Sequence, residues 1–424
     1  MAEVTLEQVL LARENRARRQ RDLLAEYGKP LICFTLNIAG PVKVDSCTDY
    51  AFRTGCSRLL DGLKTVGIPI VFQEDISGSA GFGRMLVADA EAARVKRLCV
   101  QLEEQDALGR LFDMDVLAEN GEKLERQRER RCLVCGQPGR ACASRRLHPL
   151  TDIQAATRRI ILEHKRQADS ERIAALAVQS LLDEVCATPK PGLVDRRDNG
   201  SHRDMDIFTF NASAAALWPY FQKCFLAGEE TRHEPPEIAF AHLNALGVTA
   251  EGTMRQATAN VNTHKGAIFT LGIMCGAAGR VWGLEQPRLI PWLDACAELA
   301  QGYDAPGVRH EAAGGLPAVR SAGLPALRAA RNRGFDLNDQ CLAALLRLLG
   351  YVNDTNMTAR GGKDRAEASR AEARGKADAW EDPLALHACM AALNENYIAQ
   401  NLSPGGCADL LAATLLADRW IQGA

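Results

Sequence analysis

Residues 109–116 read Gly-Arg-Leu-Phe-Asp-Met-Asp-Val, and this stretch determines how the first part of the chain is interpreted. On a β-strand successive side chains alternate between faces, so Asp113 and Asp115 point the same way while their apolar neighbours point into a core. Two adjacent carboxylates repel unless a cation lies between them, and such hard oxygen ligands suit Mg²⁺ bound to phosphate oxygens. The pattern indicates a strand that carries a magnesium site. Two solvated acids are the alternative interpretation.

The segments around this stretch predict a mixed α/β domain over residues 1–165. Charged residues from Leu6 to Tyr27 predict a helix, and the short apolar run Leu31–Asn37 predicts a strand. Further strands are predicted at Ile68–Gln73, Leu98–Glu103 and Leu111–Leu117. Because a carboxylate pair on a strand is typical of polymerase-like nucleotidyltransferases, we expect an α/β, nucleotidyltransferase-like fold for this domain.

The rest of the chain, residues 171–424, is expected to form an all-α helical domain. Apolar residues recur at helical spacing in 173–181, 342–349 and 411–416, and no convincing alternating segment follows residue 170. The polar stretch Lys165–Ser170 is the predicted hinge between the two domains. The charged, alanine-rich segment Lys363–Asp378 has no apolar face, and either an exposed helix or a loop would explain it.

Composition and charge narrow the classes of function. The chain has 424 residues, 47% of them hydrophobic and 25% charged, which is typical of a soluble protein with two or three domains. A formal net charge of −2 gives no reason to expect binding to nucleic acid or to an anionic membrane. No apolar run reaches the roughly 18 residues of a membrane span, and the charged segment Met1–Arg21 lacks the apolar middle of a signal peptide. We therefore expect a cytoplasmic protein.

Three of the fourteen cysteines lie close together in the sequence. The pattern Cys132-x2-Cys135-x6-Cys142-x5-His148 offers three thiols and an imidazole, which is enough for a tetrahedral zinc site. Free cysteines and redox roles are the other interpretations. A catalytic zinc is disfavoured, because four protein ligands would close the site. The remaining cysteines are scattered and are expected to be small buried residues.

Six polar strings interrupt the helices of the second domain. They are Ala187–Asp195 (Ala-Thr-Pro-Lys-Pro-Gly-Leu-Val-Asp), Ser201–Asp206, Asn262–Gly266 (Asn-Thr-His-Lys-Gly), Arg309–Ala312, Asp354–Asn356 with Arg360–Gly362, and Ser403–Asp409. Each string alone has an ordinary explanation as a loop or a helix cap. Together, with cations and acids at the ends of apolar helices, they suit a site inside a helical bundle that binds polyphosphate. The last string opens a helix, whose free amide groups favour an anion.

The first domain resembles the apo-citrate lyase phosphoribosyl-dephospho-CoA transferases, also called holo-acyl-carrier-protein synthases of citrate lyase. Three motifs occur in the family's order: Asn37–Lys43 (Asn-Ile-Ala-Gly-Pro-Val-Lys), Gly109–Val116 and the stretch Cys132–His148. The resemblance covers most of residues 1–165. Ala39 departs from the family pattern, which reads Asn-Ile-Pro-Gly-Pro.

This resemblance implies that residues 1–165 join a phosphoribosyl-dephospho-CoA group to a serine of the citrate lyase acyl carrier (γ) subunit, with release of pyrophosphate. Mg²⁺ held by Asp113 and Asp115 would neutralise charge on the α-phosphate and on the leaving pyrophosphate. Lys43 and Arg110 are the expected phosphate contacts. Glu103 or Glu104 is a candidate for a third carboxylate.

The second domain, residues 171–424, resembles the triphosphoribosyl-dephospho-CoA synthases of the citrate lyase system. Four motifs match in order: Thr188–Asp195, Asn262–Gly266, Asp354–Asn356 and Ser403–Leu411. One departure is His310, where the family usually has glycine in Arg-Gly-Glu-Ala. The resemblance implies that ATP and 3′-dephospho-CoA react to give 2′-(5″-triphosphoribosyl)-3′-dephospho-CoA and adenine.

That reaction breaks an N-glycosidic bond, so carboxylates are expected near the ribose, where positive charge develops. The expected catalytic acids are Asp195, Glu311 and Asp354, and the acids expected to hold Mg²⁺ are Asp206 and Asp409. The groups expected to bind phosphate or substrate are Lys190, His264, Lys265, Arg360, Ser403, Gly405 and Gly406.

The two resemblances support each other, because the product of the second domain is the substrate of the first. We therefore expect a bifunctional transferase that makes and attaches the citrate lyase prosthetic group, with ATP, 3′-dephospho-CoA and the acyl carrier subunit as partners. Three alternatives remain: the equivalent enzymes of malonate decarboxylase, a non-catalytic half that only docks the carrier, and an unrelated Mg²⁺-dependent ATPase that releases phosphate.

Overall fold

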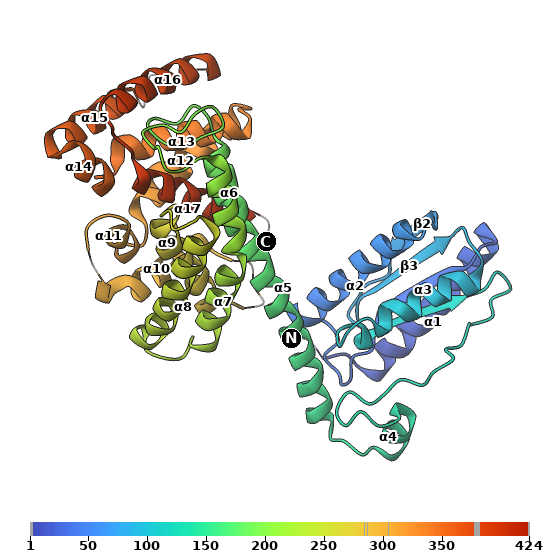
Figure 1. The fold of residues 1–424 in the computed structure, drawn as a ribbon. Helices are drawn as coiled ribbons and strands as arrows, with labels where there is room; N and C mark the ends of the chain where they lie inside the picture. Colours follow the sequence, from blue (N-terminus) through green and yellow to red (C-terminus); the bar gives the residue numbers. More distant parts are fainter. Residues whose placement is uncertain (1–2, 284, 286, 304, 377–381, 423–424) are drawn as a thin grey trace. The chain divides into compact units, whose positions relative to one another are not determined.

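The computed structural model describes residues 3–283, 285, 287–303, 305–376 and 382–422 (Figure 1). The chain divides into two compact units, Met1–Gln167 and Ala168–Ala424, and each is treated separately below. Among the described residues, no helix combines the length and the apolar character that a membrane crossing requires.

The first unit contains a four-stranded antiparallel sheet with strand order β2-β3-β1-β4. Its elements are α1 (Leu6–Tyr27), β1 (Leu31–Leu36), α2 (Ser46–Thr65), β2 (Ile70–Asp75), β3 (Gly83–Ala88), α3 (Ala92–Glu104), the 3₁₀ turn η1 (Gly109–Leu111), β4 (Phe112–Leu117), α4 (Gly139–Arg145) and the start of α5 (Leu150–Cys186). The predicted helix Leu6–Tyr27 and the strands near 31–37, 68–73 and 111–117 are confirmed.

Helices cover both faces of this sheet. Leu23 of α1 packs on Leu31 and Cys33 of β1 and on Met85 and Val87 of β3. On the opposite face, α2 and α3 cover the alternate residues of the central strands, where the rings of Phe34 and Phe52 stack at 5.2 Å and Phe34 meets Phe112 edge-on at 5.4 Å. Asp115 lies opposite Cys33 of β1, which packs on α1, and Asp113 points the same way as Asp115. Both aspartates therefore lie on the face that α1 covers.

One strand prediction in this half of the chain is wrong. Leu98–Glu103 lies in the helix α3 and not in a strand, because Val95, Leu98 and Cys99 follow helical spacing and are buried on one side. The predicted hinge Lys165–Ser170 does contain the boundary between the two compact units, which falls between Gln167 and Ala168, but the stretch is helical and lies inside α5. Its lysine, arginine, glutamine and alanine residues all have high helix propensity, which explains the continuous helix. The strand β3 was not predicted at all.

The described part of the second unit has no strand, which confirms the all-helical prediction. After the end of α5 it consists of α6 (Ile207–Ala216), α7 (Trp218–Glu230), α8 (Pro236–Ala257), α9 (Lys265–Arg280), α10 (Leu289–Ala300), η2 (Gln301–Tyr303), α11 (Val308–Ala313), the π-turn η3 (Val319–Gly323), α12 (Leu324–Asn332), α13 (Leu337–Tyr351), α14 (Thr355–Gly361), α15 (Lys363–Lys376), α16 (Pro383–Ala399) and α17 (Gly405–Gln422).

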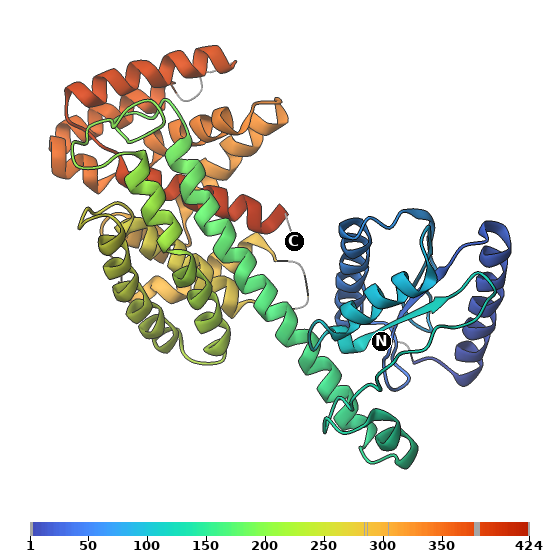
Figure 2. The same ribbon diagram turned by 45° about the vertical axis from the view of Figure 1, so that its right-hand side comes forward.

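The helix α9 lies at the centre of the second unit and contacts α7, α8, α10 and α17 (Figure 2). Almost every residue from Ala267 to Gly279 is buried. Helices α7 and α9 approach so closely that a Cβ atom on Gly228 would lie 1.9 Å from the carbonyl oxygen of Gly276. Only glycine fits at such a crossing, so the small residues of both helices set their distance.

The segment Lys363–Asp378, for which the sequence left two alternatives, forms the helix α15 over Lys363–Lys376. Residues 377 and 378 lie outside the described residues. Ala366 and Ala373 of α15 are buried, and the helix packs on α13. The absence of large apolar residues is therefore consistent with a packed helix, because alanine and Ser369 form its buried side.

Candidate active sites

Asp113 and Asp115 of β4 lie side by side on one face of the sheet, opposite Thr35 and Cys33 of β1. Their side chains are 45% and 31% exposed, respectively. Both carboxylates line a hollow of about 1170 Å³. Phe112, by contrast, is completely buried on the other face. The alternation that the sequence predicted therefore presents two carboxylates to open space.

Each of these carboxylates has a cationic partner from the segment that follows β4. Lys123 donates to Asp115 at 2.7 Å, and Arg130 donates to Asp113 at 3.3 Å. These two pairs place acids and cations within hydrogen-bonding reach of one another, an arrangement that can bind a metal ion and phosphate oxygens together. Lys123 and Arg130 were not among the residues predicted from the sequence, because they lie in a run of charges that usually forms a solvated surface.

Glu103 anchors the arginines of this hollow. It is buried on α3, accepts a hydrogen bond from the backbone N–H of Met114 at 2.7 Å, and pairs with Arg126 at 2.5 Å and Arg130 at 2.7 Å. Burial raises the pKa of Glu103, and the nearby charge of Arg130 opposes that rise. The structure therefore places Glu103 beneath the aspartates as the partner of two arginines. Glu104, the other candidate, is half exposed and lies 3.9 Å from Arg126.

Lys43 and Arg110 lie in different places. Lys43 lines a second hollow of about 600 Å³, together with Asn37, Asp113 and the loop 78–83. Its amino group donates to the carbonyl of Ile38, and burial lowers its pKa. Arg110 lines the hollow of the aspartates, but its guanidinium donates to the backbone carbonyls of two residues of the following loop. Asp113 borders both hollows and thus links the two predicted phosphate contacts.

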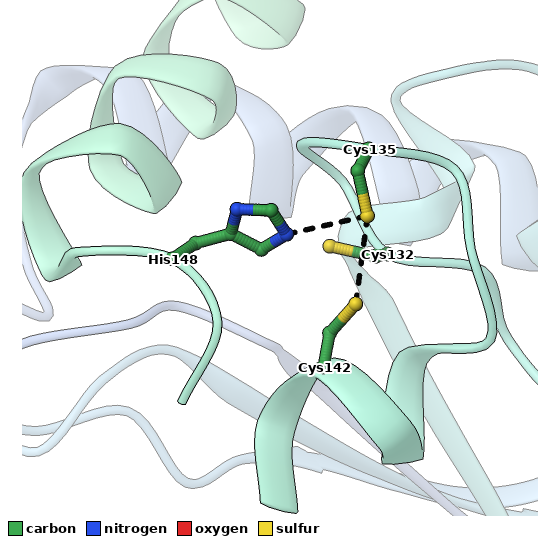
Figure 3. A group of neighbouring side chains, drawn as sticks. All are labelled: Cys132, Cys135, Cys142 and His148. Atoms are coloured by element: carbon green, nitrogen blue, oxygen red, sulfur yellow. Dashed lines mark hydrogen bonds between the residues drawn. The ribbon is translucent and has the colours of Figure 1, made fainter. Parts of the chain in front are cut away.

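Cys132, Cys135, Cys142 and His148 come together in one group (Figure 3). One ligand atom from each residue lies within 4.8 Å of all the others. The Sγ atoms of Cys135 and Cys142 are 3.5 Å apart, and Nε2 of His148 lies 3.2 Å from Sγ of Cys135. A tetrahedral zinc ion with Zn–S bonds of about 2.3 Å would separate two sulfurs by roughly 3.8 Å. The donor set and the spacing therefore fit zinc.

In the second unit, residues of all six polar strings line one hollow of about 430 Å³. Several of the predicted binding residues are among them: Lys190, His264, Lys265, Arg360, Ser403, Gly405, Gly406 and Asp409. Arg309 joins them, with its guanidinium carbon 5.6 Å from the centroid of the Phe269 ring. The hollow is polar and rich in cations, which suits a ligand with several phosphate groups.

A buried ion pair forms one wall of this hollow. Lys190 donates to Glu184 of α5, and both residues line the hollow. Asp409 lies nearby. Burial raises its pKa well above the usual value, and the charges of Glu184 and Asp354 add to the effect. Glu184 was not predicted from the sequence, because it lies in a regular helix outside every string.

Gly266 explains how Asp409 fits at the start of α9. A Cβ atom on Gly266 would lie 1.9 Å from Oδ2 of Asp409, so any larger residue would displace the carboxyl group. The same carboxyl group is stabilised in its ionised form by the backbone N–H of Ala267. The glycine of the Asn-Thr-His-Lys-Gly string therefore makes room for an acid from the last string.

His264 is a neutral hydrogen-bonding group in this site. It is buried, and burial lowers its pKa to about 3, with Lys190 contributing to the shift. Thr263 donates to the hydroxyl of Ser213 at 2.8 Å, and that hydroxyl lies 2.7 Å from Nδ1 of His264. Nε2 has no partner within the described part of the chain. The hydroxyl of Ser213 can donate to Nδ1, and in that tautomer Nε2 carries the proton and is a free donor.

Arg360, His202 and Ser403 form another side of the hollow. Arg360 donates to the carbonyl of Ser201 at 3.0 Å and lies 3.3 Å from Nδ1 of His202, whose Nε2 is 2.8 Å from the hydroxyl of Ser403. Burial, followed by the charge of Arg360, lowers the pKa of His202. The neutral histidine thus joins two of the predicted substrate-binding residues.

Four of the predicted acids do not line the hollow and instead hold backbone segments. Asp206 caps α6, and Asp354 caps α14 while also accepting the N–H of Cys407 at 2.9 Å. Asp195 accepts the N–H of Lys190 at 2.8 Å, and Glu311 accepts the N–H of Ala318 at 3.0 Å. Asp195 and Asp354 therefore fix the ends of strings whose neighbouring residues line the hollow. Burial raises the pKa values of Asp354 and Glu311.

Two family models match the chain along most of its length. Residues 4–164 match the family described as apo-citrate lyase phosphoribosyl-dephospho-CoA transferase. Residues 170–301 and 286–424 match the family described as ATP:dephospho-CoA triphosphoribosyl transferase.

Related proteins align with the whole chain or with a large part of it. "Protein CitXG" of Haemophilus influenzae is 31% identical over 452 residues, covering 98% of this chain and 96% of that protein. "Protein CitXG" of Leuconostoc mesenteroides subsp. cremoris is 29% identical over 464 residues, covering 99% and 97%. The 2-(5″-triphosphoribosyl)-3′-dephosphocoenzyme-A synthase of Haemophilus ducreyi is 35% identical over 323 residues, covering 66% and 98%.

The two sites and these matches define a bifunctional transferase. The chain belongs to the family of fused proteins in which a phosphoribosyl-dephospho-CoA transferase is joined to a triphosphoribosyl-dephospho-CoA synthase. Together these two enzymes make and attach the prosthetic group of citrate lyase.

Proposed function

We propose that the hollow of the second unit converts ATP and 3′-dephospho-CoA into 2′-(5″-triphosphoribosyl)-3′-dephospho-CoA and adenine, and that the hollow beside β4 then transfers the phosphoribosyl-dephospho-CoA group to a serine of the citrate lyase acyl carrier (γ) subunit. The observation that carries this proposal is the convergence of six separate strings on one cation-rich hollow, in a chain whose first unit has a second, acid-bearing hollow.

In the first reaction, the 2′-hydroxyl of dephospho-CoA attacks C1′ of the ATP ribose and the bond to adenine breaks. Positive charge develops on the ribose, and carboxylates stabilise it. Asp409 and Glu184 are the acids that line the hollow. Because burial raises the pKa of Asp409, this group can carry a proton and pass it to the departing adenine.

The triphosphate remains on the transferred ribose and needs cationic contacts throughout the reaction. We assign this role to Lys265, Arg309 and Arg360, which line the hollow from three different strings. His264 would donate a hydrogen bond through Nε2, since its low pKa prevents it from acting as a cation near neutral pH. Lys190 is paired with Glu184 and would position that carboxylate.

In the second reaction, the serine hydroxyl of the carrier attacks the α-phosphate of the triphosphoribosyl group, and pyrophosphate leaves. Lys123 and Arg130 would bind phosphate oxygens, because both cations already lie against the acids of the hollow. Asp113 and Asp115 fit Mg²⁺, since they present oxygen ligands from one strand face to open space. Such a metal, when bound, neutralises charge on the α-phosphate and on pyrophosphate. No reaction step is assigned to the cysteine–histidine group.

One assay tests both activities. The purified protein is incubated with ATP, Mg²⁺ and dephospho-CoA, adenine is measured by chromatography, and apo-carrier subunit is then added and weighed by mass spectrometry. We expect adenine, then pyrophosphate and a mass gain on the carrier serine. Release of phosphate without adenine would identify an ATPase and overturn the proposal for the second unit. Carrier binding without a mass gain would reduce the first unit to a docking module.

A further inference from the structure

The cysteine–histidine group lies in the loop that supplies the cations of the first hollow. Cys132 follows Arg130 by two residues, and both lie in one hairpin turn that the bridge between Arg131 and Pro138 closes. The N–H of Gly139 donates to the carbonyl of Arg130 at 2.9 Å, and the N–H of Cys132 donates to the carbonyl of Gln137 at 2.7 Å. The turn that presents the cysteines therefore also fixes the backbone of Arg130.

Arg110 ties the same turn to the start of β4. Its guanidinium donates to the carbonyl of Arg131 at 2.6 Å and to that of Cys132 at 3.0 Å. Arg110 directly precedes Leu111 and the strand that bears Asp113. The cysteine turn is thus attached to the carboxylate strand on one side through Arg110 and on the other through the contact between Arg130 and Asp113.

We propose that Cys132, Cys135, Cys142 and His148 bind one structural zinc ion, and that this ion positions Arg130 beside Asp113 for phosphate binding. The second half of the proposal rests on the transferase function proposed above. The four residues come from a short turn, from α4 and from the segment before α5. Metal ligation would join these pieces, as it does in small zinc-bound modules.

The donor set favours zinc over other interpretations. Three sulfurs and one imidazole nitrogen match the closed tetrahedral sites of structural zinc, and soft thiolate ligands discriminate against Mg²⁺ and Ca²⁺. A disulfide between Cys135 and Cys142 would not explain why Cys132 and His148 lie next to these two cysteines. A closed coordination sphere also leaves no open position for substrate, so the ion acts on the structure by positioning Arg130.

The first test measures the metal content of the protein and does not depend on its activity. The full-length protein is purified without added metal and its zinc content is measured by elemental mass spectrometry. We expect one zinc ion per chain. Cys142→Ser should lose it, whereas Cys389→Ser, which changes a half-buried cysteine of α16, should keep it. Replacing zinc with Co²⁺ should give the visible absorption of tetrahedral cobalt bound to thiolates. A wild-type protein without zinc that also fails to bind Co²⁺ would overturn the proposal.

The second test connects the metal to Arg130. In Cys142→Ser, the KM for the triphosphoribosyl donor should rise about tenfold, the size expected when one hydrogen bond to a charged group is lost, while the kcat of carrier modification changes less. Arg130→Lys should raise the same KM and retain zinc. Adenine release by the second unit should be unchanged in both variants, and the retained kcat of carrier modification shows that the first unit is folded. Zinc loss without a change in KM would overturn the positioning role.

These readouts separate the two proposals. Zinc at one per chain in a protein that modifies no carrier would support the metal site and overturn the transferase function. Carrier modification by a protein that never binds metal would support the function and overturn the metal site.

Discussion

Lys190 and Glu184 form an ion pair in which only 1% of the lysine side chain and 5% of the glutamate side chain are exposed. The lysine comes from the proline-rich loop and the glutamate from α5, and both line the hollow of the second unit. Taking two charges out of water costs several kcal/mol, so each residue is tolerable in this position only because the other is present.

Lys190→Met would leave the carboxylate of Glu184 buried without its cation. We expect the free energy of unfolding to fall by about 3–5 kcal/mol. The double variant Lys190→Met/Glu184→Leu removes both charges and should recover most of that loss, yet it should not release adenine. Urea unfolding followed by circular dichroism measures the stability. A stable double variant with normal adenine release would show that the pair has a structural role alone.

Asp113→Asn should abolish carrier modification without affecting adenine release. Removing one carboxylate from the strand face weakens metal binding and charge stabilisation, so we expect a loss of roughly 10²-fold or more in the rate of pyrophosphate release. Asp61→Asn changes an exposed carboxylate of α2 and serves as the control. Equal rates for the two variants would remove Asp113 from the proposed site.

Gly266→Ala should displace Asp409, because the added methyl carbon would lie 1.9 Å from its carboxyl oxygen. We expect adenine release to be lost and carrier modification with supplied intermediate to be retained. Gly252→Ala is a matched control, since Gly252 is exposed on α8 and a Cβ atom there meets nothing within 4 Å. This control should keep full activity and raise stability by about 0.5–1 kcal/mol. Adenine release at the wild-type rate in Gly266→Ala would argue against a role for Asp409.

His264 should make the second unit less stable in acid. Its pKa is about 3 in the folded protein and about 6.5 in the unfolded chain, so the unfolded state takes up the proton first as the pH falls. The contribution of neutral His264 is complete above pH 6.5 and should shrink by about 2 kcal/mol between pH 7 and pH 5. We would compare urea unfolding of the wild type and His264→Gln at both pH values. A stability difference that does not change with pH would contradict the buried, neutral histidine.

Local patterns in the sequence predicted the elements that depend on neighbouring residues. The alternation at 112–117 identified β4 and the shared face of Asp113 and Asp115, because side-chain direction on a strand follows from position alone. Helical spacing likewise identified α13 and α17. The strand β3 was missed because almost all of its residues are buried, on both faces of the sheet, so its sequence lacks the alternation of apolar and polar residues that identifies a strand.

The candidate sites were predictable only in part for the same reason. The polar strings predicted the residues that line the second hollow, since loops rich in proline and glycine can be recognised in the sequence. Glu184 and Glu103 were not visible as ion-pair partners, because each lies in a regular helix and meets its cation only through tertiary packing. Asp195 and Asp354 lie in the right strings, yet their carboxylates accept backbone hydrogen bonds, a distinction that spacing does not reveal.

The position of β4 at the end of the sheet has a consequence for solubility. An edge strand exposes backbone groups that can pair with another chain and seed aggregation. Here the N–H of Leu124 donates to the carbonyl of Val116 at 2.9 Å, and Lys123 forms a bridge with Leu117, so the chain folds back over its own edge. The segment that places Lys123 beside Asp115 therefore also shields this edge from self-association.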